Sequence, residues 1–177
     1  MQIKFWPFDL KLAHRWTIAS RLGPGGGGGT ELSPVVFVEL RDKNGLAGLG
    51  EAAPSNRYQE DLETTIRFLE QVDPAQLSFA DVPASLACLD RLSEKDFAPK
   101  GAINMALLDG AARRSGQPIY DYLGLGFTEK KHVTSFSIGI DLPDRIREKV
   151  FQAESYPVLK IKVGGADDKS TLAVVRE

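Results

Sequence analysis

The chain has 177 residues, 42% of them hydrophobic, and a formal charge of −2 at pH 7, which is typical of a soluble α/β protein that buries its own core. Its 22 basic and 24 acidic side chains are interspersed without a polybasic block, so we expect it to bind neither nucleic acid nor a membrane surface. It has one cysteine, no apolar signal core at its N-terminus and no stretch near the roughly 18 apolar residues of a membrane span, which together predict a cytoplasmic protein.

Three strands of an antiparallel sheet are predicted at the start of the chain. They cover residues 2–12, 34–42 and 46–53, and Asn44-Gly45 predicts a tight hairpin turn between the last two. A glycine run from Gly23 to Gly29, interrupted by one proline, separates the first two strands, and its backbone entropy makes any fixed conformation costly. This loop is either a disordered surface connection or a lid that closes over a ligand.

Helical periodicity follows the sheet. One helix is predicted from about Gln59 to Val72, where apolar residues recur at spacings of three and four. Pro83 can start a second helix, and Pro99 is expected to precede a third that runs from about Lys100 to Ser115. Cys88 lies in the second helix, where we expect a packed thiol rather than a nucleophile, because no histidine or basic pair is apparent nearby.

The last part of the chain predicts a βαβ unit. A strand at 132–140, a helix at 143–154 and a strand at 158–163 span about 31 residues, which fits a crossover between parallel strands. Another helix begins at Asp167, and the sequence stops inside it at Glu177. Two parallel strands cannot close a barrel or complete a doubly wound sheet, so we expect the second domain to be incomplete over this length.

Two lysines in the last predicted strand require an explanation. Side chains alternate across a strand, so Lys160 and Lys162 share one face while Leu159, Ile161 and Val163 share the other. Burying two ammonium groups side by side is costly unless the shared face opens on a cavity that uses their charge. A Lys-x-Lys sequence alone usually means a solvated strand face, but the βαβ context favours the functional interpretation.

The order of these segments resembles a known family. An antiparallel sheet, the helix Gly101–Gly110 and then Leu159–Gly164 are similar to the mandelate racemase and muconate lactonizing branch of the enolase superfamily. Within that branch, Gly48–Pro54, Arg57-Tyr58 and Thr134–Asp141 look most like dipeptide epimerases that act on Ala-Glu-type dipeptides.

The resemblance implies a fold and a function. The fold is an α+β capping domain at 1–125, followed at 126–177 by the start of a TIM-like (β/α)7β barrel that is truncated after about two strands. The function is that of the N-terminal half of a Mg²⁺-dependent dipeptide epimerase, an isomerase that abstracts the proton α to a carboxylate or amide and forms an enediolate. Alternatives are an amino-acid racemase, a muconate cycloisomerase, an o-succinylbenzoate synthase, or a noncatalytic module that binds a partner through its exposed barrel edge. The expected partner is a small-molecule substrate, and a homo-oligomer is compatible with the sequence.

Four residues are candidates for the site. By resemblance, Lys162 transfers the proton and Lys160 contacts a substrate carboxylate; the ammonium of Lys160 also disfavours protonation of Lys162, as a general base requires. Ser137 is expected near the end of the preceding strand, either as a substrate contact or as packing. Arg21, just before the glycine run, could bind a substrate carboxylate from the mobile loop of the capping domain.

Magnesium ligands are not expected in these residues. The resemblance places the metal-binding carboxylates on the third, fourth and fifth barrel strands and an opposing lysine on the sixth, in a missing C-terminal part. Asp167 and Asp168 start a helix and Asp141 precedes one, where carboxylates suit the helix dipole, so we assign none of them to the metal. This segment alone would supply only half of the acid–base machinery and would be inactive.

Overall fold

The computed structural model describes residues 1–19, 29–165 and 167–177. The chain divides into two compact units. The first contains Met1–Leu10 and Ser33–Phe127, and the second contains Lys11–Leu32 and Thr128–Glu177. The assignment of 1–125 as a capping domain and of 126–177 as the start of a barrel stays a prediction. In the described part of the chain, no helix combines the length and the apolar character needed to cross a bilayer.

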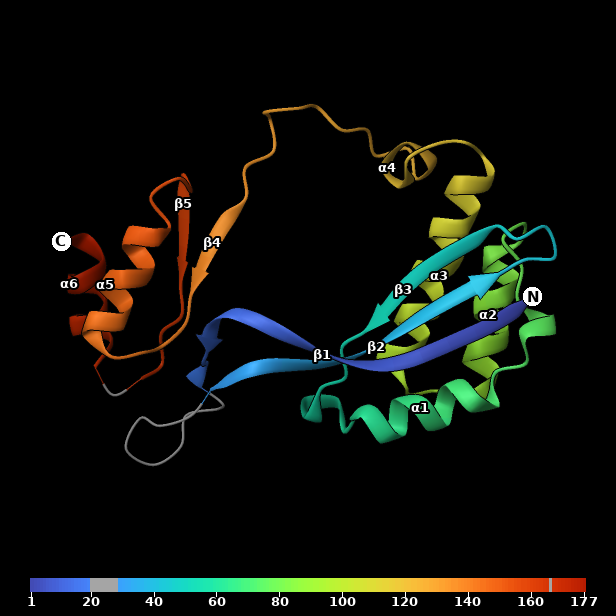
Figure 1. Cartoon of the computed structure of the whole chain (residues 1–177), viewed down its shortest axis with the longest axis horizontal. Coiled ribbons are helices and arrows are strands. Elements are labelled where there is room, and N and C mark those ends of the chain that lie inside the picture. The colour runs from blue at the N-terminus through green and yellow to red at the C-terminus, as the bar shows by residue number, and fades with distance from the viewer. Residues whose placement is uncertain (20–28, 166) are drawn as a thin grey trace. The chain divides into compact units, whose positions relative to one another are not determined.

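The first unit is built on a three-stranded sheet with the order β1-β2-β3 (Figure 1). The strands are β1 (Gln2–Trp16), β2 (Thr30–Arg41) and β3 (Ala47–Ala52); residues 11–16 of β1 and 30–32 of β2 belong to the second unit. The last two pair antiparallel, and the turn between them has Gly45 at φ 86°, a conformation that glycine adopts without steric cost. The predicted hairpin is therefore confirmed.

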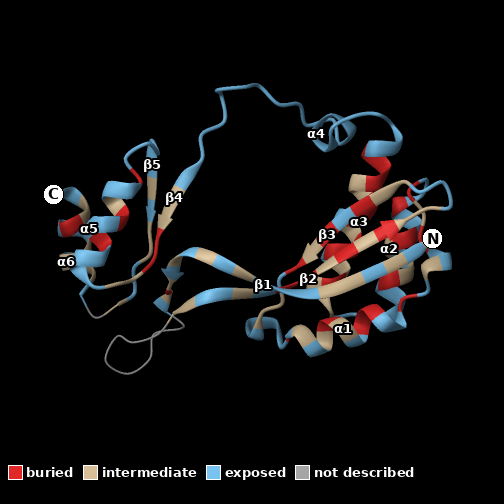
Figure 2. Cartoon of the chain, viewed as in Figure 1, coloured by how far each residue is buried: buried red, intermediate tan, exposed pale blue. Residues whose placement is uncertain are grey.

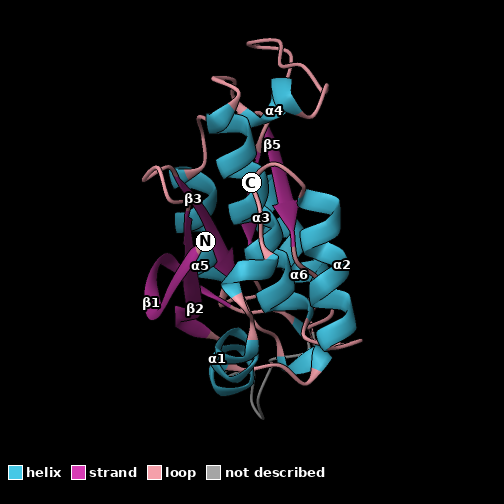
Figure 3. Cartoon of the chain, turned by 90° about the vertical axis from the view of Figure 1, so that its right-hand side faces the viewer, coloured by secondary structure: helices cyan, strands magenta, loops and turns pink. Residues whose placement is uncertain are grey.

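Helices cover one face of this sheet (Figure 3). They are α1 (Leu62–Gln71), α2 (Val82–Leu92) and α3 (Phe97–Arg114). A short helix, α4 (Ile119–Tyr122), follows α3 and has no buried residue, and short 3-10 turns lie at Asn56–Tyr58 and Pro74–Gln76. Buried residues concentrate between the sheet and the three long helices (Figure 2), and the core contains Val36, Val38, Leu40, Phe68, Leu69, Leu89, Ile103 and Leu107. This arrangement confirms the predicted α+β fold.

The helix starts differ from the sequence prediction for local reasons. Helix α1 begins after Asp61, whose carboxylate accepts the N–H of Thr64 at 2.8 Å while the Thr64 hydroxyl accepts the N–H of Asp61 at 2.9 Å, a reciprocal cap. Helix α3 begins before Pro99 rather than after it, because a first-turn proline lacks only an N–H that would have no helical partner. The N–H of Ala98 is instead donated to the buried carboxylate of Glu60 at 3.0 Å.

The second unit contains a βαβ element, as predicted. It consists of β4 (Ser135–Ile138), α5 (Pro143–Gln152) and β5 (Val158–Ile161), followed by α6 (Asp168–Arg176). The two strands are parallel. Ile138, Ile146 and Val174 form the centre of its core, so both helices cover the same face of the two-stranded sheet.

Candidate active site at the lysine strand

The two lysines lie on the face of β5 that points away from the core. Leu159 and Ile161 pack against the apolar cluster under the helices, so the alternating side chains of Lys160 and Lys162 project from the opposite face. Lys162 follows the last residue of β5, and its N–H donates to the carbonyl of Ile138 at 2.9 Å, which continues the pairing with β4 by one residue. Lys160 is exposed and Lys162 is half-buried.

Ser137 lies beside this lysine pair. It is the direct partner of Lys160 in the parallel ladder, and paired residues of neighbouring strands project from the same face of a sheet. Ser137 is half-buried. The structure therefore brings a hydroxyl and two ammonium groups together on one face, at the end of two adjacent parallel strands.

Arg21 is the remaining candidate residue, and Arg57-Tyr58 is one of the segments that carry the family resemblance. Arg21 lies within residues 20–28, outside the described residues, so its role stays a prediction. Arg57 and Tyr58 lie in a 3-10 turn of the first unit, where the exposed Tyr58 ring meets the ring of Phe97 edge-on at 6.3 Å.

Trp16 was missed by the sequence analysis. Its indole ring lies 5.8 Å from the Nζ of Lys162, measured to the ring centroid, which is a cation–π distance. The predicted first strand ended near residue 12, whereas β1 continues to Trp16. The sequence signal that could have found it is the continued alternation after residue 9, which puts Leu10, Leu12 and Trp16 on one face of the strand.

The end of β1 is held against the end of β4 by backbone contacts. The carbonyl of Thr17 accepts the N–H of Ile140 at 3.1 Å. Between them, Gly139 has no space for a side chain, since an added Cβ would lie 2.9 Å from the Thr17 oxygen. Glycine at this position therefore permits the close approach that brings Trp16 to Lys162.

A second contact to the end of β1 comes from an ion pair. Nζ of Lys149, whose residue is 7% exposed, donates to Oδ2 of Asp141 at 2.7 Å and to the carbonyl oxygen of Arg15 at 3.4 Å. Burial raises the pKa of Asp141, but the hydrogen bonds from Lys149 and Leu142 and the nearby positive charges outweigh it, so the pKa lies below its ordinary value of 3.8. Asp141 is thus an ionised partner of Lys149.

The carboxylates near the strand ends have structural partners. Asp167 accepts the N–H of Ser170 at 3.0 Å as the N-cap of α6, and Asp168 accepts the N–H groups of Gly164 and Gly165 at 2.9 and 3.0 Å. Within residues 1–19, 29–165 and 167–177, no three His, Cys, Asp or Glu side chains come together as a metal site would require. The described residues therefore do not form a magnesium site by themselves.

Cys88 differs from its prediction in one respect. Its thiol is half-buried, but the Arg91 guanidinium, one helical turn away, donates to Sγ at 2.9 Å. No histidine or basic pair was apparent near Cys88 in the sequence; the structure adds this single arginine, because residues three apart on a helix are neighbours.

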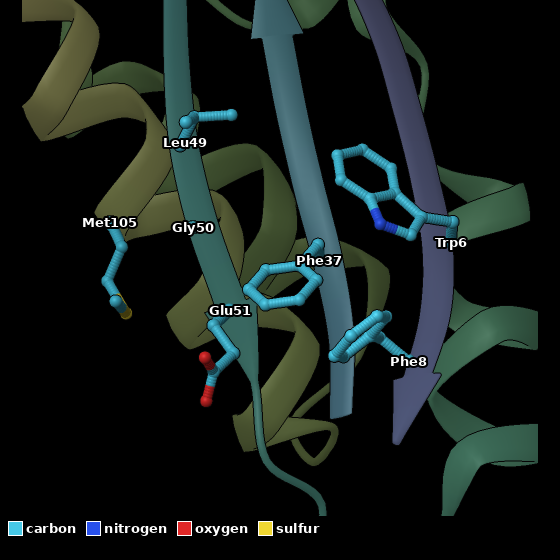
Figure 4. Close-up of a pocket in the computed structure, with 7 residues that line it drawn as sticks. All are labelled: Trp6, Phe8, Phe37, Leu49, Gly50, Glu51 and Met105. Atoms are coloured by element: carbon cyan, nitrogen blue, oxygen red, sulfur yellow. The ribbon is translucent and has the colours of Figure 1, made fainter. Parts of the chain in front are cut away.

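An apolar groove of about 460 Å³ lies on the sheet of the first unit (Figure 4). Its lining is aromatic and aliphatic apart from one carboxylate, and comprises Trp6, Phe8, Phe37, Leu49, Gly50, Glu51 and Met105. Glu51 is its one titratable group, so the groove lacks the paired acid–base residues that the lysine strand provides.

The family is settled by a direct match. The model of the mandelate racemase/muconate lactonizing enzyme N-terminal domain matches residues 28–124. The chain belongs to this family. Its α+β sheet and helices are the domain that the family model describes.

Relatives within the mandelate racemase/muconate lactonizing enzyme family include several epimerases. The chain is 56% identical over 177 residues to an L-Ala-D/L-amino acid epimerase of Pedosphaera parvula, covering all of this chain and 50% of that protein. It is 35% identical to an L-Ala-D/L-Glu epimerase of Bacteroides thetaiotaomicron, covering 99% of this chain and 44% of that one. The solved dipeptide epimerase of Enterococcus faecalis, complexed with Mg and L-Leu-L-Tyr, is similar with a TM-score of 0.84 at 26% identity, over 99% of this chain and 49% of that one. The chain spans about half the length of these relatives.

Proposed function

We propose that this chain is the capping domain and the lysine-bearing first part of the barrel of a Mg²⁺-dependent dipeptide epimerase, an isomerase of the cytoplasm. The observation that carries the proposal is the pair Lys160 and Lys162 on the open face of β5, beside Ser137. Its similarity to dipeptide epimerases supports the substrate class, a dipeptide with a free carboxylate.

Lys162 is the proton-transfer group in this proposal. A neutral lysine amine removes the proton α to the substrate carbonyl, and the half-buried position of Lys162 limits the water that competes for its lone pair. Among the described residues no carboxylate forms an ion pair with it. An epimerase needs a second group on the opposite substrate face, which this chain leaves to the remainder of the protein.

Lys160 and Ser137 bind and orient the substrate. The exposed ammonium of Lys160 can attract a substrate carboxylate, and charge-assisted hydrogen bonds of this kind are short and directional. Ser137, its neighbour across the ladder, can donate a further hydrogen bond. Both stabilise the negative charge that grows as the proton leaves. Arg21 is proposed to contact the substrate carboxylate from the loop before the glycine run.

Magnesium supplies charge stabilisation to the proposed chemistry. Magnesium was present in the solved Enterococcus faecalis relative, and this supports the metal requirement. Because the described residues offer no cluster of ligands, we propose that the remainder of the protein provides them.

The test is α-deuteration by the full-length protein with L-Ala-L-Glu and magnesium in heavy water. The proposal predicts deuterium at the α-carbon of the glutamate, and a protein that introduces none is not an epimerase of that dipeptide. Lys162→Ala should abolish the proton transfer assigned to that lysine. Lys169→Ala removes an exposed lysine of α6 and serves as the matched control, with activity at the wild-type level.

A further inference from the structure

We propose that Trp16 is a positioning residue for Lys162, and that its indole face stabilises the ammonium that forms as Lys162 removes the substrate proton. This inference rests on the proposed function of Lys162. The ring centroid lies 5.8 Å from Nζ, and the negative face of an indole attracts a cation but not a neutral amine. The contact therefore strengthens while positive charge develops on Nζ, which lowers the barrier to proton removal.

A ring suits this position better than a carboxylate. A carboxylate beside Lys162 would form a salt bridge and hold the lysine protonated before the reaction. The described residues contain no such ion pair to Lys162. An aromatic face offers no proton acceptor that competes with the amine, yet it orients the ammonium once it exists.

Trp16 is fixed in place by three contacts around it. The carbonyl of the next residue, Thr17, accepts a hydrogen bond from the backbone N–H of Ile140, and the carbonyl of the preceding residue, Arg15, accepts one from the side-chain Nζ of the buried Lys149. Gly139 allows the two strand ends to meet, and a Cβ there would lie 3.6 Å from the Trp16 ring. Because the residues before and after it are fixed, Trp16 is already in place before the reaction. It can therefore position Lys162 without a large loss of conformational entropy when the proton is transferred.

The expected effect of removing the ring is modest and directional. Cation–π contacts at partly exposed sites are worth about 0.5–2 kcal/mol, which corresponds to roughly a twofold to thirtyfold change in rate. Because Lys162 is proposed to act on one face of the substrate, the loss should affect removal of the proton from only one epimer. A purely structural role of Trp16 would instead slow both epimers together.

The experiment measures solvent deuterium exchange separately at the α-carbon of L-Ala-L-Glu and of L-Ala-D-Glu, using the full-length protein. Lys162→Ala first identifies which epimer depends on Lys162. Trp16→Leu should slow exchange of that same epimer by about tenfold and leave the other within about twofold of wild type. Trp16→Phe keeps an aromatic face, so it should restore most of the exchange rate that Trp16→Leu loses. It also keeps the test valid if the leucine variant folds poorly.

The matched control is the second tryptophan. The ring of Trp6 lies 5.4 Å from Nζ of Lys4 in the first unit, so Trp6→Leu removes a contact of the same kind away from the lysine strand and should leave both epimers unchanged. Equal loss for both epimers in Trp16→Leu, or no loss, overturns the role of Trp16 alone. A wild-type protein that exchanges neither epimer overturns the proposed function, and the role of Trp16 with it.

Discussion

The buried ion pair between Lys149 and Asp141 allows a direct test of how the end of β1 is held. Asp141→Asn keeps the shape of the side chain and the hydrogen bond from the Leu142 N–H, but removes the negative charge. Lys149 then stays in a nearly buried site with only the Arg15 carbonyl as acceptor. The perturbation thus separates the charge from the packing.

The magnitude follows from the exposure of the two side chains. Breaking a fully buried pair costs about 3–5 kcal/mol, whereas exposed pairs contribute about 0–1 kcal/mol. The side chain of Lys149 is 9% exposed and that of Asp141 is 23% exposed, which places this pair between the two limits. We expect Asp141→Asn to lower the free energy of unfolding by about 2 kcal/mol, or to lower the urea midpoint by about 1 M.

The assay is urea unfolding followed by the fluorescence of Trp16. The sequence contains two tryptophans, so a Trp6→Phe background leaves Trp16 as the reporter of the unit that holds the ion pair. The control is Asp144→Asn, which removes a 97% exposed carboxylate paired with Arg147 in the same unit. That control should leave the urea midpoint unchanged, because the lost interaction is solvent-screened.

The stability difference between the wild type and Asp141→Asn should change with pH in one direction. The folded-state pKa of Asp141 lies below its ordinary value of 3.8, so its contribution to stability is fully present above that value and is lost as the pH falls through the folded-state pKa. The difference between wild type and Asp141→Asn should be constant from about pH 5 to pH 7 and should shrink below about pH 4. A variant as stable as the wild type at pH 7, or a difference that grows on acidification, would refute this reasoning.

Three further substitutions test the packing and the site. Gly50→Ala places a Cβ against the carbonyl of Ala102 and should lower the free energy of unfolding, measured by urea titration, by about 1–3 kcal/mol. Gly101→Ala is the control, because a Cβ added there meets no atom of the described residues within 4 Å apart from its chain neighbours and the backbone of its own helix, and it should not destabilise the protein in the same titration. Thr65 is 1% exposed, and its hydroxyl has no hydrogen-bond partner among the described residues. Thr65→Val removes this hydroxyl, so thermal unfolding should show a stability equal to that of the wild type or greater by up to about 1 kcal/mol. A clear loss of stability would mean that the hydroxyl has a hydrogen-bond partner. Ser137→Ala should lower kcat/KM for L-Ala-L-Glu by about tenfold in steady-state kinetics, the value of one hydrogen bond, and an unchanged value would leave Ser137 a packing residue.

The elements that depend on local sequence were predictable. The hairpin at Asn44-Gly45 follows from turn preference, and the parallel pairing of β4 with β5 follows from the spacing of a crossover. The face shared by Lys160 and Lys162 follows from alternation alone. Errors at local boundaries, such as the start of α3 before Pro99, arise because tertiary partners such as Glu60 complete helix ends.

The surroundings of the lysines could not be predicted in the same way. The contact of Trp16 with Lys162 joins residues far apart in sequence, and it depends on Gly139 and on the bond between Thr17 and Ile140. Lys149 has the sequence position of an ordinary helix lysine, yet it is buried because Asp141 and the Arg15 carbonyl accept hydrogen bonds from its ammonium. Such contacts follow from tertiary packing and leave no periodic signal.

The central claim is that Lys162 transfers a proton on one face of a dipeptide substrate. It is tested most directly by the α-hydrogen exchange of the two Ala-Glu epimers in heavy water, with magnesium present, for the full-length Lys162→Ala variant. The account predicts that one epimer stops exchanging while the other, which depends on the opposing base, continues. Unchanged exchange of both epimers would contradict the role assigned to Lys162.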